Sequence, residues 1–314
     1  MNGNERVRTH TASPGEKVPG LTPPSKPALG FDFASLKPPE PGLHIVATPI
    51  GNLGDITLRA LNVLHNADVI YCEDTRHTRR LTGRFAIKTK LSPYHDHNAE
   101  RVRPEILARL GAGATLALVS DAGTPLISDP GYKLIVAAVG AGHAVTTEPG
   151  PSAAIAALVL SGLPTDRFLF LGFLPPKSAA RRAVLQEIKT VRASLVLFEA
   201  PQRLAASLAD LAAILGNRPA AIAREITKLH EEVRRGGLAD LAAAFPEAPK
   251  GEIAIVIGPP DAEPPAAEEL DAALEAALGH ESLKTAVAQV AARLALPRAQ
   301  VYARALTLTG RKAP

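Results

Sequence analysis

Short apolar runs alternate with helix-like runs along the chain from residue 43 onward. Four apolar runs have the length and composition of buried strands, at residues 43–47, 68–72, 115–119 and 143–147. Helix-like runs lie between or after them, at residues 57–65, 100–110, 132–139 and 152–160. Asp55 is the predicted N-cap of the first of these helices. The alternation predicts an α/β domain with a parallel or mixed sheet and helices on its faces.

A second set of strands and helices follows the turn at residues 161–164. Strands are predicted at 168–173, 195–198, 220–224 and 252–257, and helices at 179–190 and 203–215. The predicted organisation is a disordered tail (1–41), an N-terminal α/β domain (42–162), a second α/β domain (163–260) and a linker with a helical segment (261–314). The tail is rich in Pro, Gly, Ser, Thr and Lys and has no periodicity, which is typical of disorder.

The C-terminal segment has a helical pattern with a basic bias. Its apolar residues recur at helical spacing, at Leu283, Val287, Val290 and Leu294. Pro297 is a suitable first residue for another helix. From Glu281 to the end there are six Lys or Arg residues and one acidic residue. Two short basic helices fit contact with RNA in a helix-turn-helix manner, and a solvated helical cap fits the same pattern equally well.

Composition narrows the class of protein. The chain has 314 residues, of which 46% are apolar, enough for two domains with ordinary cores. Cys72 is the one cysteine, so no internal disulfide forms, and its apolar surroundings predict a packing role. The net charge of +4 permits an anionic partner. No apolar run has the roughly 20 residues of a membrane helix, and no signal-peptide pattern is present. We expect a soluble cytoplasmic protein.

The most informative segment is Ser120–Gly131, which reads Ser-Asp-Ala-Gly-Thr-Pro-Leu-Ile-Ser-Asp-Pro-Gly. Two glycines and two prolines impose an unusual backbone path on this loop. The loop follows a predicted strand, and open α/β sheets bind ligands at the carboxyl ends of their strands. Two further loops, 48–57 and 148–153, have the same placement. Their common position predicts one shared ligand cleft.

Several familiar site motifs are absent from the sequence. It contains no G-x-x-x-x-G-K-[ST] phosphate loop and no G-x-G-x-x-G dinucleotide fingerprint. No Cys/His spacing indicates zinc, and the run His95-Asp96-His97 lacks a further cluster to complete a metal site. We therefore expect no metal.

Two charged segments follow predicted strands. Glu73-Asp74-Thr75-Arg76 precedes Arg79, Arg80 and Arg84, and Arg224-Glu225-Ile226-Thr227-Lys228 precedes Glu231. Each segment could hold a phosphate and supply a carboxylate base. Each could equally be a surface network of ion pairs.

Taken together, these motifs resemble the tetrapyrrole methylase superfamily, and within it the 16S rRNA cytidine 2′-O-methyltransferases. The resemblance covers residues 42–260, with a weaker match in the C-terminal helices. It rests on the segments 49–57, 73–76, 120–131, 149–153, 172–175 and 224–228. One departure is Gln202, where the family usually has His; the long N-terminal tail also lies outside the family pattern.

The resemblance implies two α/β domains with S-adenosylmethionine in the cleft between them, a small C-terminal helical segment, and usually a homodimer. It implies methylation of a cytidine ribose 2′-hydroxyl in the decoding region of 16S rRNA. The implied cofactor residues are Pro49, Ser120, Asp121, Ala122, Gly123, Ile127, Ser128, Pro149, Ser152, Ala153, Phe198 and Ala223. Candidates for the base that assists the hydroxyl are Asp121, Glu73, Asp74 and Glu225, and candidates for contact with RNA are Arg76, Arg79, Arg80 and Lys228.

Two other functions fit parts of the sequence. One is a methylase of a tetrapyrrole or another small molecule, from the same superfamily. The other is a non-catalytic RNA-binding or assembly factor, against which the intact cofactor loops argue. Cofactor binding separates the non-catalytic factor from the methylases, and methyl acceptance by RNA separates the two methylases.

Overall fold

The computed structural model describes residues 36–127, 131–261, 267–294 and 296–309. Its contacts divide the chain into two compact units, residues 1–151 and 152–314. Most of the predicted disordered tail, residues 1–35, lies outside the described residues. Residues 36–41 are described, and they contact the first unit through Lys37 O, which accepts from Asn62 Nδ2, and Glu40 O, which faces His44 Nε2 at 2.9 Å. No helix among the described residues is both long and apolar enough to cross a membrane.

The first unit is built on an all-parallel sheet of five strands in the order β3-β2-β4-β1-β5. The strands are β1 (Gly42–Val46), β2 (Val69–Cys72), β3 (Lys90–Pro93), β4 (Thr115–Val119) and β5 (Val145–Glu148). The apolar runs of β1, β2 and β4 form the buried centre, as the sequence predicts for a parallel sheet covered on both faces. The polar strand β3 was not predicted, because an edge strand carries little apolar signal.

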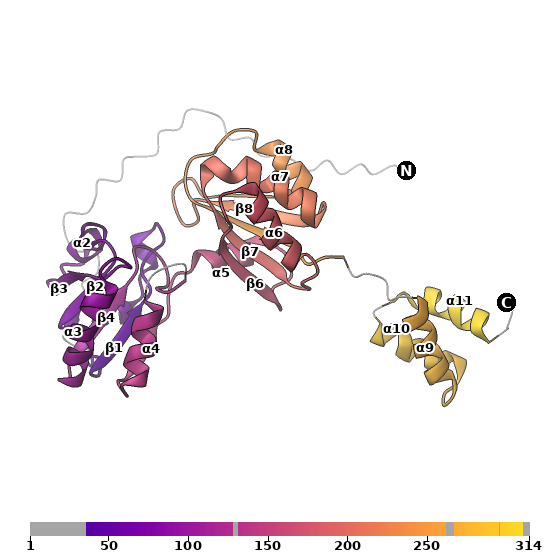
Figure 1. Ribbon diagram of the computed structural model, residues 1–314, viewed down its shortest axis with the longest axis horizontal. Helices are drawn as coiled ribbons and strands as arrows, with labels where there is room; N and C mark the ends of the chain where they lie inside the picture. The colour runs from indigo at the N-terminus through magenta and orange to yellow at the C-terminus, as the bar shows by residue number, and fades with distance from the viewer. Residues whose placement is uncertain (1–35, 128–130, 262–266, 295, 310–314) are drawn as a thin grey trace, which may run out of the picture. The chain divides into compact units, whose positions relative to one another are not determined.

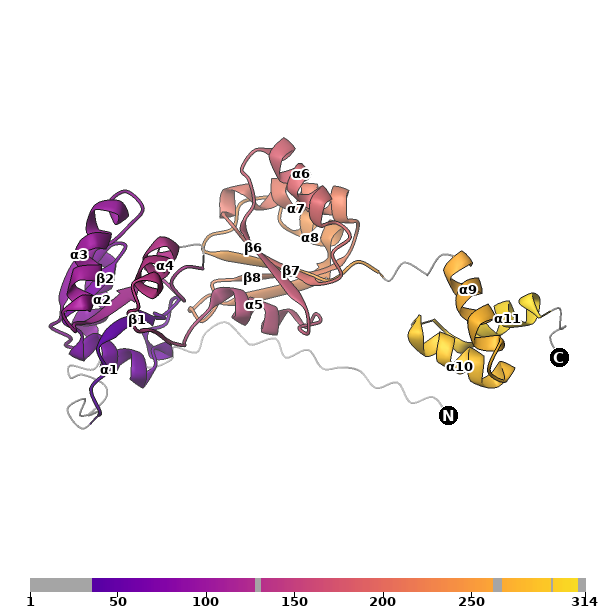
Figure 2. The ribbon, with the colours of Figure 1, turned by 60° about the horizontal axis from the view of Figure 1, so that its bottom comes forward.

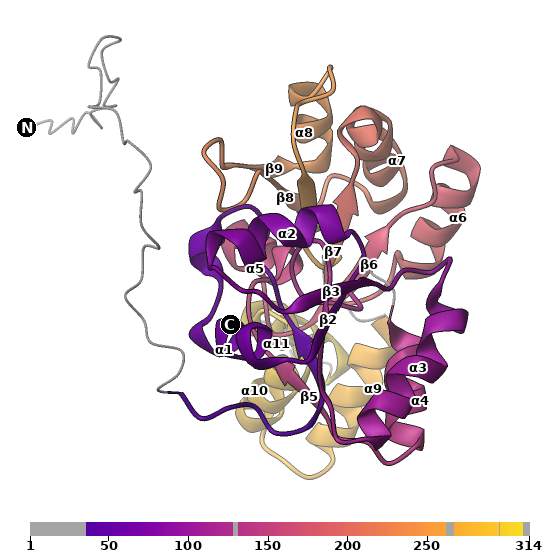
Figure 3. The same ribbon diagram turned by 90° about the vertical axis from the view of Figure 1, so that its left-hand side faces the viewer.

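Two helices cover each face of this sheet (Figure 3). They are α1 (Leu58–Asn66) and α2 (Thr75–Arg84) on one face, and α3 (Ala99–Gly111) and α4 (Tyr132–Gly140) on the other. Cys72 is fully buried beneath α1 and α2, in agreement with its predicted packing role. The predicted N-cap of α1 is wrong: Thr57, and not Asp55, accepts the hydrogen bond from Ala60 N. Asp55 instead ends a short 3-10 helix, Leu53–Asp55.

The strand order creates a point where the chain reverses its direction across the sheet. From β1 the chain passes over β4 to reach β2, whereas from β4 it passes over β1 to reach β5. Connections that leave neighbouring strands in opposite directions open a crevice at the strands' carboxyl ends, and ligands bind there in open α/β sheets. The loops after β1 and β4 lie at this crevice.

The second unit has a mixed sheet in the order β6-β7-β10-β8-β9. Its strands are β6 (Phe168–Phe173), β7 (Ser194–Glu199), β8 (Pro219–Arg224), β9 (Glu232–Gly237) and β10 (Ile253–Ile257). Only β6 and β7 pair in parallel. The charged edge strand β9 was not predicted, since its sequence, Glu-Val-Arg-Arg-Gly-Gly, lacks an apolar pattern.

Helices cover both faces of the second sheet (Figure 2). Helix α5 (Ala153–Ser161) packs on one face, and α6 (Ser178–Ile188), α7 (Leu204–Leu215) and α8 (Leu238–Ala244) pack on the other. The contacts therefore divide the chain after Pro151, earlier than the predicted boundary at 162. The physical reason is that Ala154, Ala157 and Leu158 of α5 bury their side chains against the second sheet.

The C-terminal segment forms three helices with a core of their own (Figure 1). They are α9 (Ala267–Leu278), α10 (Leu283–Arg293) and α11 (Arg298–Leu308). Val287 and Val290 are buried in this core, as their spacing predicts, and Pro297 directly precedes α11. Helix α9 was not predicted.

Candidate functional site

Three loops of the first unit meet at the carboxyl ends of β4, β1 and β5. Thr48 and Gly123 pair through two backbone hydrogen bonds, with N···O distances of 2.9 and 3.0 Å. Thr124 Oγ1 donates to the carbonyl oxygen of Pro151 at 3.2 Å. The loops that the sequence singled out separately are therefore in direct contact.

Gly123 lies where these loops are closest. Its φ of 78° is in the left-handed region, which favours glycine. A Cβ atom at this position would lie 3.3 Å from Ile50 Cγ2 and 3.7 Å from the carbonyl oxygen of Pro151. A side chain at residue 123 would therefore strain the backbone and push the neighbouring loops apart.

A pocket of about 310 Å³ opens beside the same loops. The loop after β1, the loop after β4 and helix α2 line it, through Thr48, Pro49, Gly51, Leu53, Ser120, Asp121, His77, Thr78, Arg80 and Leu81. Ser120 is buried and donates its hydroxyl within its own loop, toward the carbonyls of Ala122 and Gly123. Thr48, Gly51 and Leu53 belong to the predicted ligand loop 48–57, whereas His77 and Thr78 of α2 were not predicted to line the site.

Two of the predicted carboxylates have structural partners in this region. Asp74 caps α2: it accepts from Arg76 N at 2.8 Å and from the Arg76 guanidinium at 2.7 Å. These bonds hold the pKa of Asp74 well below its usual range. Asp121 Oδ1 accepts from Asp74 N at 3.1 Å and so ties the loop after β4 to the loop after β2.

Glu73 differs from its neighbour Asp74. Burial raises the pKa of its carboxyl, and the charges of Asp121 and Asp96 raise it further. Its side chain accepts no hydrogen bond from any residue within the described ranges. A carboxylate with a raised pKa is a stronger proton acceptor, so Glu73 has the properties of a general base.

The predicted RNA-contacting residues fall into two groups. Arg76 pairs with Asp74, whereas Arg79 and Arg80 are exposed on α2 and form no ion pair with any described residue. Lys228, in the second unit, is held by Glu225 at 2.8 Å and Glu252 at 2.7 Å.

The second unit brings two predicted cofactor residues together. Phe198 on β7 and Ala223 on β8 both pair with Ala254 of the intervening strand β10, so the three residues lie in one row across the sheet. The Phe198 ring also contacts Phe170 and Phe173, with centroid distances of 5.1 and 5.7 Å. Glu225 Oε1 accepts from Lys228 Nζ and from Glu252 N, and these bonds lower the pKa of its carboxyl.

The remaining predicted residues have simpler surroundings. Ala122, Ile127 and Pro149 are exposed on their loops. Ser152 and Ala153 begin α5, and the Ser152 hydroxyl does not cap that helix. Ser128 lies outside the described residues. No group of three or more His, Cys, Asp or Glu side chains suited to a metal ion occurs in the described part of the chain.

Comparisons with solved structures support the fold. A diphthine synthase superposes with a TM-score of 0.54 at 16% identity, over 69% of this chain and 89% of its own. The methyltransferase CobJ gives a TM-score of 0.55 at 18% identity, over 70% of this chain and 94% of its own.

Comparisons of sequence identify the family. The family model of the tetrapyrrole (corrin/porphyrin) methylases matches residues 42–242, and that of the RsmI C-terminal HTH domain matches residues 264–309. The ribosomal RNA small subunit methyltransferase I of Mesorhizobium japonicum is 46% identical, covering 87% of this chain and 94% of its own. The protein of the same name from Erythrobacter litoralis is 50% identical, covering 87% and 98%. The chain therefore belongs to the tetrapyrrole methylases and, within them, to the ribosomal RNA small subunit methyltransferase I family.

Proposed function

We propose that this protein methylates the 2′-hydroxyl of a cytidine ribose in the decoding region of 16S rRNA, with S-adenosylmethionine as methyl donor. The observation that carries the proposal is the meeting of three loops at the crevice between β1 and β4, beside a pocket that contains Asp121. The names of the relatives support ribosomal RNA as the substrate class. We further propose that the protein acts in the cytoplasm as a homodimer.

The residues at this crevice fit the cofactor. Gly123 allows a ligand to approach the backbone closely, and Asp121, which lines the pocket, carries a negative charge that would favour a sulfonium. In the first unit the proposed contacts are Pro49, the loop 120–128 and Pro149; in the second unit they are Ser152, Ala153, Phe198 and Ala223. When bound, the cofactor supplies an activated methyl group on sulfur.

The chain's own contribution is orientation and removal of one proton. A ribose hydroxyl is a weak nucleophile, so an acceptor that takes its proton as the O–C bond forms accelerates the reaction. Among the four predicted carboxylates, Glu73 fits this role best. Its pKa is raised and it has no hydrogen-bond donor among the described residues, whereas Asp74, Asp121 and Glu225 are each engaged.

Helix α2 supplies the proposed RNA contact in the first unit. Arg80 lines the pocket and Arg79 is exposed nearby, so both guanidinium groups are available for phosphates. The C-terminal helices α10 and α11 are a second proposed contact, since the matched domain is of the helix-turn-helix class.

The direct test is to map ribose methylation in 16S rRNA from cells with and without this protein. The proposal predicts one cytidine 2′-O-methyl group that disappears on deletion and returns with the wild-type gene. Unchanged ribosomal RNA, together with methyl transfer to a small acceptor in vitro, would instead indicate a small-molecule methylase. Absence of S-adenosylmethionine binding would indicate a non-catalytic factor.

A further inference from the structure

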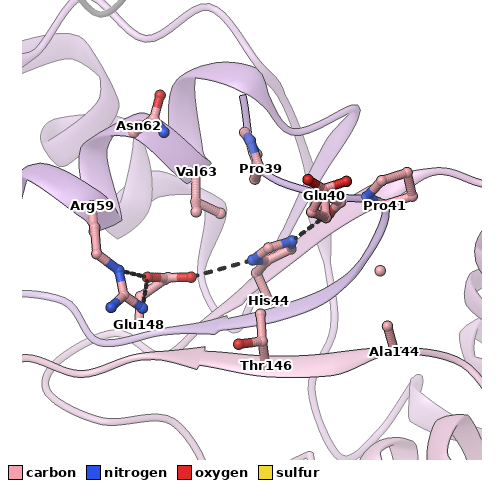
Figure 4. Close-up of a pocket in the computed structure, with 11 residues that line it drawn as sticks. Pro39, Glu40, Pro41, His44, Arg59, Asn62, Val63, Ala144, Thr146 and Glu148 are labelled. Atoms are coloured by element: carbon pink, nitrogen blue, oxygen red, sulfur yellow. Dashed lines mark hydrogen bonds and ion pairs between the residues drawn. The ribbon is translucent and has the colours of Figure 1, made fainter. Parts of the chain in front are cut away.

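Glu148, the last residue of the edge strand β5, is a buried carboxylate with a cation beside it. It is 4% exposed. Arg59 Nε donates to its Oε2 at 2.6 Å, and His44 Nδ1 lies 3.3 Å from its Oε1 (Figure 4). An unpaired buried carboxylate is strongly unfavourable, so these partners are required wherever Glu148 stays inside.

The partners of Glu148 belong to different elements of the first unit. Arg59 lies in the first turn of α1, directly after the loop 48–57, and its Nη2 also donates to the carbonyl oxygen of Thr147 at 3.1 Å. His44 is in the central part of β1, and Ala47 N donates to the backbone carbonyl of Glu148 at 3.2 Å. One carboxylate therefore joins the end of β5, the strand β1 and the start of α1.

An ion pair and a hydrogen bond hold this side chain in place. A pocket of about 330 Å³ borders it, lined by the segment 39–42, by α1 and by β5 (Figure 4). The carboxylate itself is almost fully covered, so its polar contacts with Arg59 and His44 compensate for its burial. Loss of the contacts with Arg59 and His44 would leave the Glu148 carboxylate buried and unpaired, which would favour its displacement.

Movement of Glu148 would reach the loop that follows it. A Cβ on Gly150 would lie 3.0 Å from Ala47 Cβ, so this loop packs closely against the end of β1. Pro151, at the end of the loop, accepts the hydrogen bond from Thr124. The loop after β5 is therefore in contact with both other loops at the crevice.

We propose that Glu148 is a positioning residue, which acts through Arg59 to hold the loops after β1 and β5 in the arrangement that binds the cofactor. This inference rests on the proposed use of S-adenosylmethionine. It differs from a purely stabilising role of the ion pair, which would leave the affinity of the folded protein for the cofactor unchanged.

The test measures S-adenosylmethionine affinity by calorimetry in the full chain. Glu148→Gln and Arg59→Gln are compared with Arg109→Gln, which breaks the exposed Arg109–Glu105 pair on α3. We expect about tenfold or greater weakening for the first two variants, because small misplacements of a binding group have effects of this size, and no change for the control. The double variant should bind no more weakly than Glu148→Gln alone, since both act through one contact.

Two further measurements separate positioning from stability. Hydrogen exchange should increase in residues 48–57 of Arg59→Gln and remain unchanged in α3. The KM for S-adenosylmethionine should rise while the KM for the RNA acceptor stays constant. Unchanged cofactor affinity in folded Arg59→Gln would overturn the role of Glu148 and leave the proposed function intact. A wild-type protein that does not bind the cofactor would overturn both.

Discussion

Two segments of the chain look alike in sequence and differ in what the fold makes of them. The segment 73–80 follows β2 in the first unit, and the segment 224–232 runs from the last residue of β8 to the first residue of β9 in the second; both mix acidic and basic residues at a strand end. In the second, Arg224 pairs with Glu232, and Lys228 with Glu225 and Glu252. In the first, the side chains of Glu73, Arg79 and Arg80 form no hydrogen bond or ion pair with any described residue. The unpaired guanidinium of Arg80 lines a pocket and is available for substrate, whereas the paired charges of the second segment stabilise their own loop.

Gly123→Leu should have the largest effect, because Gly123 lies among the loops proposed to bind the cofactor. The side chain would meet Ile50 and the loop after β5, so we expect cofactor binding to be lost. Gly113→Leu is the matched control, because Gly113 also has a left-handed φ, 83°, but nothing within 4 Å of its Cβ position. Both variants should lose about 1–2 kcal/mol of unfolding free energy from the backbone alone. Calorimetry with S-adenosylmethionine should separate them; equal affinities would contradict the placement of the cofactor.

The comparison predicts unequal effects for the two glutamates. Glu73→Gln should reduce kcat by about 10²–10⁴-fold, because it removes the proton acceptor. Glu225→Gln should leave kcat nearly unchanged, since Glu225 is occupied by Lys228. Rates measured with a saturating RNA acceptor decide between the two, and a large effect of Glu225→Gln with none of Glu73→Gln would reverse the assignment.

The raised pKa of Glu73 also predicts a pH dependence of the wild-type rate. Its carboxyl accepts a proton only when ionised, so kcat should fall as the pH drops through this raised pKa. The fall should therefore begin at a higher pH than an ordinary glutamate would give. A profile that stays flat down to the usual glutamate range would argue against Glu73 as the base.

Salt dependence distinguishes the basic residues of the two segments. Neutralising Arg79 and Arg80 together should flatten the slope of log affinity for RNA against log salt by about 1–2. Each phosphate contact that is lost reduces the number of counterions released when RNA binds. Lys228→Gln should leave the slope unchanged, because its ammonium already has two carboxylate partners. If Lys228→Gln flattens the slope instead, the paired segment is the RNA contact.

The smallest expected effect is on stability in the second segment. Lys228→Met should lower the unfolding free energy at pH 7 by about 1 kcal/mol, a value typical of partly exposed ion pairs. The hydrogen bond from Lys228 lowers the pKa of Glu225, so the stabilisation is present above the ordinary glutamate pKa and is lost as pH falls through the lowered one. Urea unfolding of both proteins at pH 7 and near pH 3 should show the difference shrinking in acid. A constant difference would mean that Lys228 stabilises by packing.

Sequence by itself determined much of this protein. Apolar runs long enough to be buried on both faces identified the central strands β1, β2 and β4, because a covered parallel sheet needs continuous hydrophobicity. Glycine and proline content identified the loops at the strand ends, since few other residues follow such backbone paths. The edge strands β3 and β9 were not predicted, because an exposed edge strand has no apolar pattern to recognise.

The tertiary structure decided which charged residues are free to act. Glu73 and Asp74 are neighbours in the chain, yet one is desolvated near Asp121 and the other is neutralised by Arg76. It also decided that α5 packs on the second sheet, and that Glu148 lies buried between Arg59 and His44. These outcomes depend on contacts between residues up to about a hundred positions apart, as for His44 and Glu148. Such contacts arise from strand order and loop geometry, which local residue patterns do not encode.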